Sequence, residues 1–149
     1  IDTDRMGLIG YSLGGYTVLG IAGGWHSWKD DRFKAVLALS PYIAPYLRNR
    51  GFKALDIPVM YQGGTRDDPA TPSIMRKGGA YDLTSAPKYF LEFQGAGHFS
   101  FTELEKGYHD VIRRTARDFL NKYLKGEDAV IDEAKKPQVK TFWKDEAKK

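Results

Sequence analysis

The sequence predicts an α/β fold of three layers, α/β/α, in which helices cover both faces of a mostly parallel sheet. Apolar runs at residues 6–9, 35–39, 58–62 and 88–93 predict about four strands. The runs at 35–39 and 58–62 are continuous, as is typical of parallel strands, which are buried on both faces and lack the alternation of half-exposed strands. Helical segments fill the intervals between these runs. Strands that alternate with helices are typical of a parallel sheet.

The first run leads into a sharp turn. Residues 6–9 end at Gly10, and a stretch rich in glycine and alanine follows at residues 13–22. This order predicts a strand, a tight turn and a helix. The second run is followed by Ser-Pro and the third by Gly-Gly, and both dipeptides are expected to close strands.

The clearest helix lies between residues 111 and 124, where apolar side chains recur at helical spacing and arginines occupy the other face. A glycine two residues later is a natural stop for it. We therefore expect residues 1–126 to form the domain. Residues 127–149 are mostly charged and are expected to form a loosely packed C-terminal tail, with Phe142 and Trp143 as its only anchors.

Composition narrows the possible functions. The chain of 149 residues is the length of one domain. It has no cysteine, which excludes disulfides, thiolate metal sites and a thiol nucleophile. The 23 basic and 19 acidic residues are interleaved. In a nucleic-acid-binding protein, by contrast, the basic residues cluster in one stripe of the surface. The apolar runs are too short to cross a bilayer. We expect neither a nucleic-acid partner nor a membrane span.

One motif carries chemical information. Residues 10–14 read Gly-Tyr-Ser-Leu-Gly and match G-x-S-x-G, in which a strand turns abruptly into a helix with the serine at its apex. A side chain at either Gly10 or Gly14 is expected to collide with the neighbouring strand or helix, and Gly15 adds room for close helix packing. The alternative interpretation is a glycine-rich turn around an idle Ser12.

A serine hydroxyl needs a base, and the base needs a third group to orient it. The chain supplies Asp67 and then His98, each just past the carboxyl end of a predicted strand. Parallel strands bring such positions to one edge of the sheet. Asp68 is the alternative acid, because neighbouring residues in a loop can exchange which one faces the histidine.

The remaining candidate residues are less specific. His26 and His109 are predicted to be structural or solvent-exposed. Scattered histidines without paired carboxylates predict no metal site, and serine-based hydrolysis needs no cofactor. The aromatic residues Tyr11, Tyr42 and Phe99 are expected to lie near the predicted site and to line an apolar substrate pocket.

Residues 1–125 resemble the second half of the dienelactone-hydrolase-like and platelet-activating-factor-acetylhydrolase-like branch of α/β-hydrolases. The segments that carry the resemblance are residues 4–15, 63–67 and 95–99. The chain also has the order serine, aspartate, histidine that α/β-hydrolases use.

The resemblance implies that Ser12 is the nucleophile, His98 the base and Asp67 the acid that orients the base. It also implies that the backbone N–H of Leu13 is one oxyanion-hole donor. True dienelactone hydrolases have a cysteine where this chain has Ser12, which disfavours that particular reaction.

In this family, further strands precede the sharp turn that carries the nucleophilic serine, which is called the nucleophile elbow. A loop among those strands supplies the second oxyanion donor. By this resemblance residues 1–126 are a truncated α/β-hydrolase domain, the C-terminal half of the fold. Its nucleophile strand would form an exposed edge, so we expect a homodimer or association with a separate N-terminal fragment.

The expected function is hydrolysis of small carboxylic esters through an acyl-enzyme, weakened by the missing donor. The alternatives are a fragment of a prolyl-oligopeptidase-type serine peptidase and an inactive hydrolase remnant that acts as an interaction module.

Overall fold

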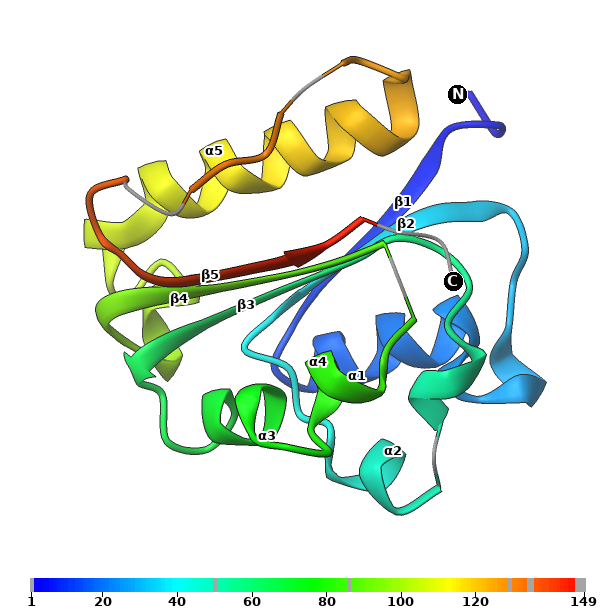
Figure 1. Cartoon of the computed structure of the whole chain (residues 1–149), viewed down its shortest axis with the longest axis horizontal. Helices are drawn as coiled ribbons and strands as arrows, with labels where there is room; N and C mark the ends of the chain where they lie inside the picture. The colour runs from blue at the N-terminus through cyan, green and yellow to red at the C-terminus, as the bar shows by residue number, and fades with distance from the viewer. Residues whose placement is uncertain (1, 50, 86, 129, 134–135, 147–149) are drawn as a thin grey trace.

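A five-stranded sheet forms the centre of the molecule (Figure 1). The computed structural model describes residues 2–49, 51–85, 87–128, 130–133 and 136–146. The first four strands are parallel and the fifth is antiparallel to the fourth. In both chain order and spatial order, the strands are β1 (Met6–Tyr11), β2 (Phe33–Leu39), β3 (Val59–Arg66), β4 (Lys88–Gly97) and β5 (Val139–Asp145).

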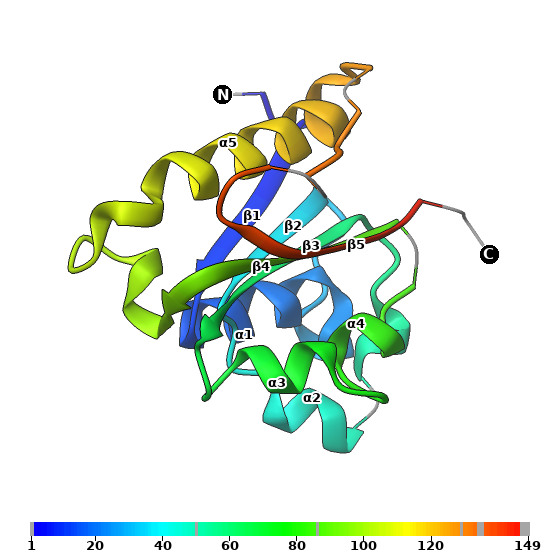
Figure 2. The same ribbon diagram turned by 60° about the vertical axis from the view of Figure 1, so that its left-hand side comes forward.

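Helices cover both faces of the sheet, which confirms the predicted three-layer α/β fold. Figures 1 and 2 show α5 on one face and α1–α4 on the other. No helix in the described ranges is long and apolar enough to cross a membrane. The α-helices are α1 (Leu13–Leu19), α2 (Ala44–Asn49), α3 (Thr71–Met75), α4 (Ala80–Leu83) and α5 (His109–Leu120).

Short 3₁₀ or π-helical turns connect these elements. The last of them, Asn121–Lys125, continues α5 as a π-helical turn and ends at Gly126, whose φ of 69° is left-handed. Glycine adopts this conformation without steric cost, so the predicted helix stop is confirmed. The other turns are Gly20–Gly24, His26–Trp28, Gly51–Ala54, His98–Phe101 and Lys106–Tyr108.

Two apolar cores lie on the two faces of the sheet, because successive side chains of a strand point to opposite sides. On the side of α1–α4, the core contains Tyr61 of β3 and Phe90 of β4. On the side of α5, it contains Met60 and Leu91 of the same two strands together with Phe119 of the helix. Neighbouring residues of each strand therefore contribute to different cores.

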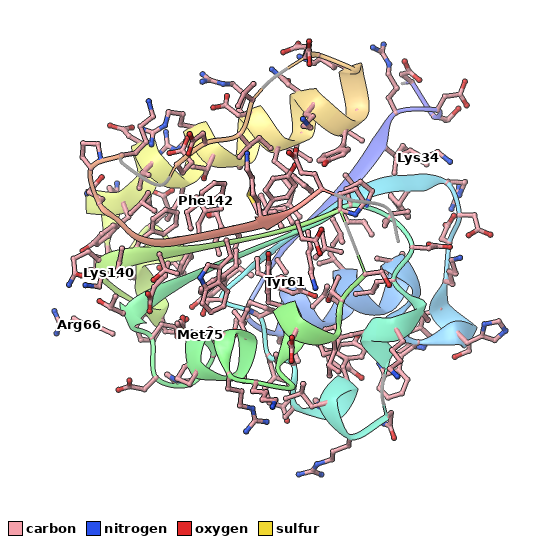
Figure 3. All side chains as sticks on the ribbon, viewed as in Figure 1. Lys34, Tyr61, Arg66, Met75, Lys140 and Phe142 are labelled. Carbon is pink, nitrogen blue, oxygen red and sulfur yellow. The ribbon has the colours of Figure 1, made fainter. Side chains whose placement is uncertain are left out.

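The sequence predicted a loosely packed tail after residue 126, but the structure places β5 there. Phe142 opposes Leu91 and Trp143 opposes Phe90 across the β4–β5 ladder. The two anchors are partly buried and pack against opposite cores, and Figure 3 shows Phe142 on the α5 side of the sheet and Tyr61 on the other side. Two consecutive apolar residues among charged ones concealed this strand, since its apolar residues follow neither strict alternation nor a continuous apolar run.

The two edges of the sheet differ in chemistry. β5 carries lysines at 140 and 144, and charged side chains of this kind prevent an edge strand from pairing with another chain. β1, at the other edge, has no charged residue in Met6–Tyr11. Its Ile9 is 52% exposed. An uncharged apolar edge is a template for further strand pairing.

We predict that the purified chain forms a dimer through β1. Light scattering at micromolar concentration should give twice the mass of one chain, and Ile9→Asp should restore the monomer by placing a charge on the edge. Leu104→Asp is the matched control, because Leu104 is 80% exposed but lies outside β1. A monodisperse monomer of the unmodified chain would contradict the prediction.

Candidate active site

The carboxyl ends of the four parallel strands lie on the same side of the molecule, and a polar residue directly follows each strand. These residues are Ser12 after β1, Ser40 after β2, Asp67 after β3 and His98 after β4. Figure 2 shows the ends of β1, β3 and β4 coming together at the left of the sheet. Ligand sites of open α/β sheets lie outside such carboxyl ends.

Ser12 occupies a strained turn between β1 and α1. Its φ is 52° and its ψ is −114°, a conformation that costs a non-glycine residue of the order of 1–3 kcal/mol. Three backbone hydrogen bonds hold it: the Ser12 N–H donates to the carbonyl of Leu39 at 3.0 Å, and the Ser12 carbonyl accepts from the N–H groups of Tyr16 and Tyr42. The side chain of this residue is only partly buried.

The glycines around the serine have different roles. A Cβ at Gly10 would lie 2.2 Å from the carbonyl oxygen of Gly14, and one at Gly15 would lie 2.7 Å from Cβ of Pro41. A Cβ at Gly14 would meet nothing within 4 Å. The expectation that a side chain would collide at both motif glycines is therefore wrong for Gly14, which lies in the first turn of α1 with open space beside it.

A chain of hydrogen bonds joins three of the predicted residues. Ser12 Oγ lies 3.0 Å from His98 Nε2, and His98 Nδ1 lies 2.9 Å from Asp67 Oδ1. The Asp67 side chain is fully buried, whereas that of His98 is 24% exposed. The hydroxyl, the imidazole and the carboxylate thus lie in series from the surface to the interior.

Asp67, rather than Asp68, contacts the histidine. The second oxygen of Asp67, Oδ2, accepts hydrogen bonds from Ser40 at 2.7 Å and from Thr71 at 3.1 Å. Asp68 is exposed and lines a surface groove with Tyr42 of the β2–α2 loop. The groove therefore lies between the loops that follow β2 and β3.

The sequence interpretation missed Ser40. Its side chain is fully buried, and Oγ lies 2.6 Å from His98 Nδ1 as well as 2.7 Å from Asp67 Oδ2. Its position in the sequence could have indicated a role in the site, because Ser40 directly follows a strand, as Ser12, Asp67 and His98 do. The Ser-Pro dipeptide was interpreted only as the end of that strand.

The loop that carries His98 is held by its own polar contacts. Gly97 N–H donates to Ser100 Oγ at 2.9 Å, and this buried hydroxyl donates to Glu105 at 2.6 Å. Upstream, Gly95 has a left-handed φ of 82°, and its N–H donates to Thr65 Oγ1 at 2.8 Å. These hydrogen bonds fix the backbone on both sides of His98 and so the position of its imidazole relative to the end of β4.

Aromatic side chains surround the imidazole. The ring centroids of Tyr11 and His98 are 5.1 Å apart, and Phe99 lies edge-on to the imidazole at 5.9 Å with 59% of its surface exposed. Burial, and then the charge of Asp67, raise the pKa of Tyr11. Its phenol therefore stays protonated at neutral pH.

The other predicted site residues lie around the elbow. Leu13 is the first residue of α1, and the first N–H groups of a helix have no acceptor within it. Tyr42 is half-exposed, and its backbone bonds to the Ser12 carbonyl. In the part of the chain that the structure describes, the hydrogen bonds of the His98 ring go to Ser12, Ser40 and Asp67 rather than to Leu13 or Tyr42.

The two remaining histidines lie apart from this cluster. His26 is exposed in the turn His26–Trp28. His109 opens α5, with Nε2 2.9 Å from the carbonyl of Thr102 and Nδ1 2.9 Å from Arg113. Within the residues that the structure describes, no three His, Cys, Asp or Glu side chains are grouped to hold a metal ion.

Comparison with known proteins identifies the type of fold and the family. Residues 1–132 match the family model described as PET hydrolase-like. A solved structure described as a predicted CIB-like hydrolase from Thermoplasma acidophilum is similar, with a TM-score of 0.60 and 15% sequence identity over 80% of this chain. The match covers 52% of that chain, so the present chain spans about half of its length. No curated protein matches.

We predict opposite effects of alanine at the two motif glycines. Gly10→Ala should lower the free energy of unfolding by at least about 2 kcal/mol, because its Cβ meets backbone atoms that cannot yield. Gly14→Ala should raise it by about 0.5–1 kcal/mol, since alanine favours an open helical position. Urea unfolding of both variants measures the difference. Equal destabilisation by the two substitutions would refute this account of the elbow.

Proposed function

The chain belongs to the PET hydrolase-like family of the α/β-hydrolase superfamily, and on that premise we propose that it cleaves carboxylic esters through a Ser12-His98-Asp67 triad. Membership of this family and the fold support a hydrolase activity. The observation that carries the finer proposal is the continuous hydrogen-bond chain of 3.0 and 2.9 Å from Ser12 Oγ to Asp67 Oδ1 through His98. The narrower dienelactone-hydrolase-like resemblance stays a prediction.

In the first half of the reaction, Ser12 Oγ attacks the ester carbonyl carbon while its proton passes to His98 Nε2. The carbonyl oxygen becomes an oxyanion, which the backbone N–H of Leu13 stabilises. Collapse of this intermediate breaks the bond to the alkoxy group, and the alcohol leaves with the proton from Nε2. An acyl group then remains on Ser12.

In the second half, water replaces the alcohol. His98 Nε2 takes a proton from the water as its oxygen attacks the acyl carbon. The second intermediate collapses, Ser12 Oγ regains the proton, and the carboxylic acid leaves. Throughout, Asp67 accepts the hydrogen bond from His98 Nδ1 and holds the ring so that Nε2 faces the hydroxyl.

Two features bear on substrate and rate. PET is a polyester, so the family description supports an ester as the bond that is cleaved. We propose that Tyr11 and Phe99, whose rings contact His98, and the half-exposed Tyr42 bind the groups on either side of that bond. Because serine hydrolases of this fold take a second oxyanion donor from a loop outside the elbow, and one donor contributes about 10²–10³ in rate, we expect slow turnover by this segment alone.

The first prediction concerns the nucleophile. The purified chain should hydrolyse p-nitrophenyl acetate and butyrate, and Ser12→Ala should reduce the rate to the background, since loss of a triad nucleophile costs about 10⁶ in kcat. The release of p-nitrophenol measures this rate.

Peptide anilides serve as the contrasting substrates in the same assay. Preferential cleavage of anilides would favour the peptidase alternative. Ester hydrolysis no faster than that of Ser12→Ala would instead favour the inactive interaction module.

The second prediction separates the two neighbouring aspartates. Asp67→Asn should lower kcat by about 10⁴, because the amide leaves the imidazole in the wrong tautomer. Asp68→Asn should leave kcat unchanged, since Asp68 is exposed and turned into the groove. Steady-state kinetics on p-nitrophenyl butyrate compares the pair. The reverse ranking would assign the triad acid to Asp68.

A further inference from the structure

Ser40 combines burial with an uncommon backbone conformation. Its side chain is fully buried and its φ is 44°, in the left-handed region. Residues other than glycine rarely adopt this conformation, and where they do the cost is often retained for function. The backbone N–H of Ser40 donates to the carbonyl of Gln62 at 2.8 Å, so the residue is fixed against β3, the strand that leads to Asp67.

The hydroxyl of Ser40 lies between two groups of the proposed triad. Oγ is 2.7 Å from Asp67 Oδ2 and 2.6 Å from His98 Nδ1. A hydroxyl has one proton to donate and lone pairs to accept with. Since the carboxylate can only accept, Ser40 donates to Asp67 and accepts from His98.

This arrangement requires the proton of His98 to be on Nδ1. The Nδ1–H then has two acceptors, Ser40 Oγ at 2.6 Å and Asp67 Oδ1 at 2.9 Å. In a neutral imidazole the other nitrogen, Nε2, is then unprotonated and can accept the proton of Ser12, which lies 3.0 Å away. Ser40 and Asp67 together therefore select the tautomer that the reaction needs.

We propose that Ser40 is a positioning residue that holds the Asp67 carboxylate and the His98 ring in their reactive orientation. The inference rests on the proposed function, because the orientation matters only if His98 acts as the base. Ser40 does not touch the reacting atoms. It acts through Asp67 and His98 and extends the hydrogen-bonded series from three residues to four.

Loss of the hydroxyl should leave a folded protein. Thr71 also donates to Asp67 Oδ2, at 3.1 Å, and His98 still bonds to Oδ1, so the buried carboxylate keeps a partner at each oxygen. What Ser40→Ala removes is the second acceptor of the Nδ1 proton and one of two donors to Oδ2. The ring and the carboxylate then have more than one orientation.

The test compares three variants in kinetics and in proton NMR. Ser40→Ala removes the hydroxyl. Ser40→Gly removes it and also relieves the left-handed φ. Thr84→Val is the matched control, because Thr84 is a buried hydroxyl, 2% exposed, that bonds to Tyr61 and to the carbonyl of Ala80 rather than to the triad.

With p-nitrophenyl butyrate, we expect kcat of both Ser40 variants to fall about 10- to 100-fold, the scale of a small misplacement of catalytic groups, while KM changes little. Thr84→Val should keep the kcat of the unmodified chain. If Ser40→Ala retains that kcat, or if Ser40→Gly recovers it, the inference is overturned.

The NMR readout does not depend on turnover. The downfield resonance of the His98 Nδ1 proton, assigned by its loss in His98→Ala, should shift and exchange faster in both Ser40 variants and stay unchanged in Thr84→Val. An unchanged resonance in Ser40→Ala would overturn the inference. Absence of Ser12-dependent turnover in the unmodified chain would overturn the proposed function instead, and the resonance would still report whether Ser40 orients the ring.

Discussion

The carboxylate of Asp67 has no contact with solvent, so the protein must supply all of its hydrogen bonds. An unpaired buried charge costs about 3–5 kcal/mol. The partners come from three elements: Ser40 at the end of β2, His98 at the end of β4 and Thr71 at the start of α3. The pairing of β2 with β3 and of β3 with β4 is therefore tied to this one group. A shift of either neighbouring strand would remove one of the partners of the carboxylate.

The first strand meets a different constraint. β1 must present Ser12 at a left-handed φ of 52° while it forms the edge of the sheet. The Ser12 N–H bonds to the end of β2, and its carbonyl bonds to Tyr16 of α1 and to Tyr42 of the β2–α2 loop. The backbone of the strained residue is thus held by β2, by the loop that follows β2 and by α1. The open space beside Gly14 and the exposed Ile9 lie at the same strand and turn, which makes this edge the part of the site that is least supported within the chain.

The sequence predicted the parts of the fold that repeat a simple pattern. The apolar runs that became β2 and β3 are continuous, and Ser12, Asp67 and His98 each follow a run. Two strands extend further than predicted, because glycines inside them permit close contacts rather than ending the strand. A Cβ at Gly64 would lie 2.2 Å from the carbonyl oxygen of Ala96. Because glycine has no Cβ, β3 and β4 can stay paired up to their carboxyl ends, where the candidate site lies.

The two features that the sequence did not predict, β5 and the role of Ser40, depend on contacts between residues far apart in the chain. β5 has no local signal stronger than two adjacent aromatic residues, and its position follows only from its pairing with β4. Ser40 belongs to no motif, and its contacts with Asp67 and His98 span 27 and 58 residues of sequence. Such contacts arise from the order of the strands in the sheet, which the separate runs do not specify.

The central claim is that Ser12 is activated by His98, which the buried Asp67 orients. Reaction of the chain with a fluorophosphonate probe, followed by mass spectrometry of the proteolytic peptides, tests it most directly. The account predicts a single adduct on Ser12 that forms in the unmodified chain and is lost in His98→Ala. An unlabelled Ser12, or labelling that persists without His98, would contradict it.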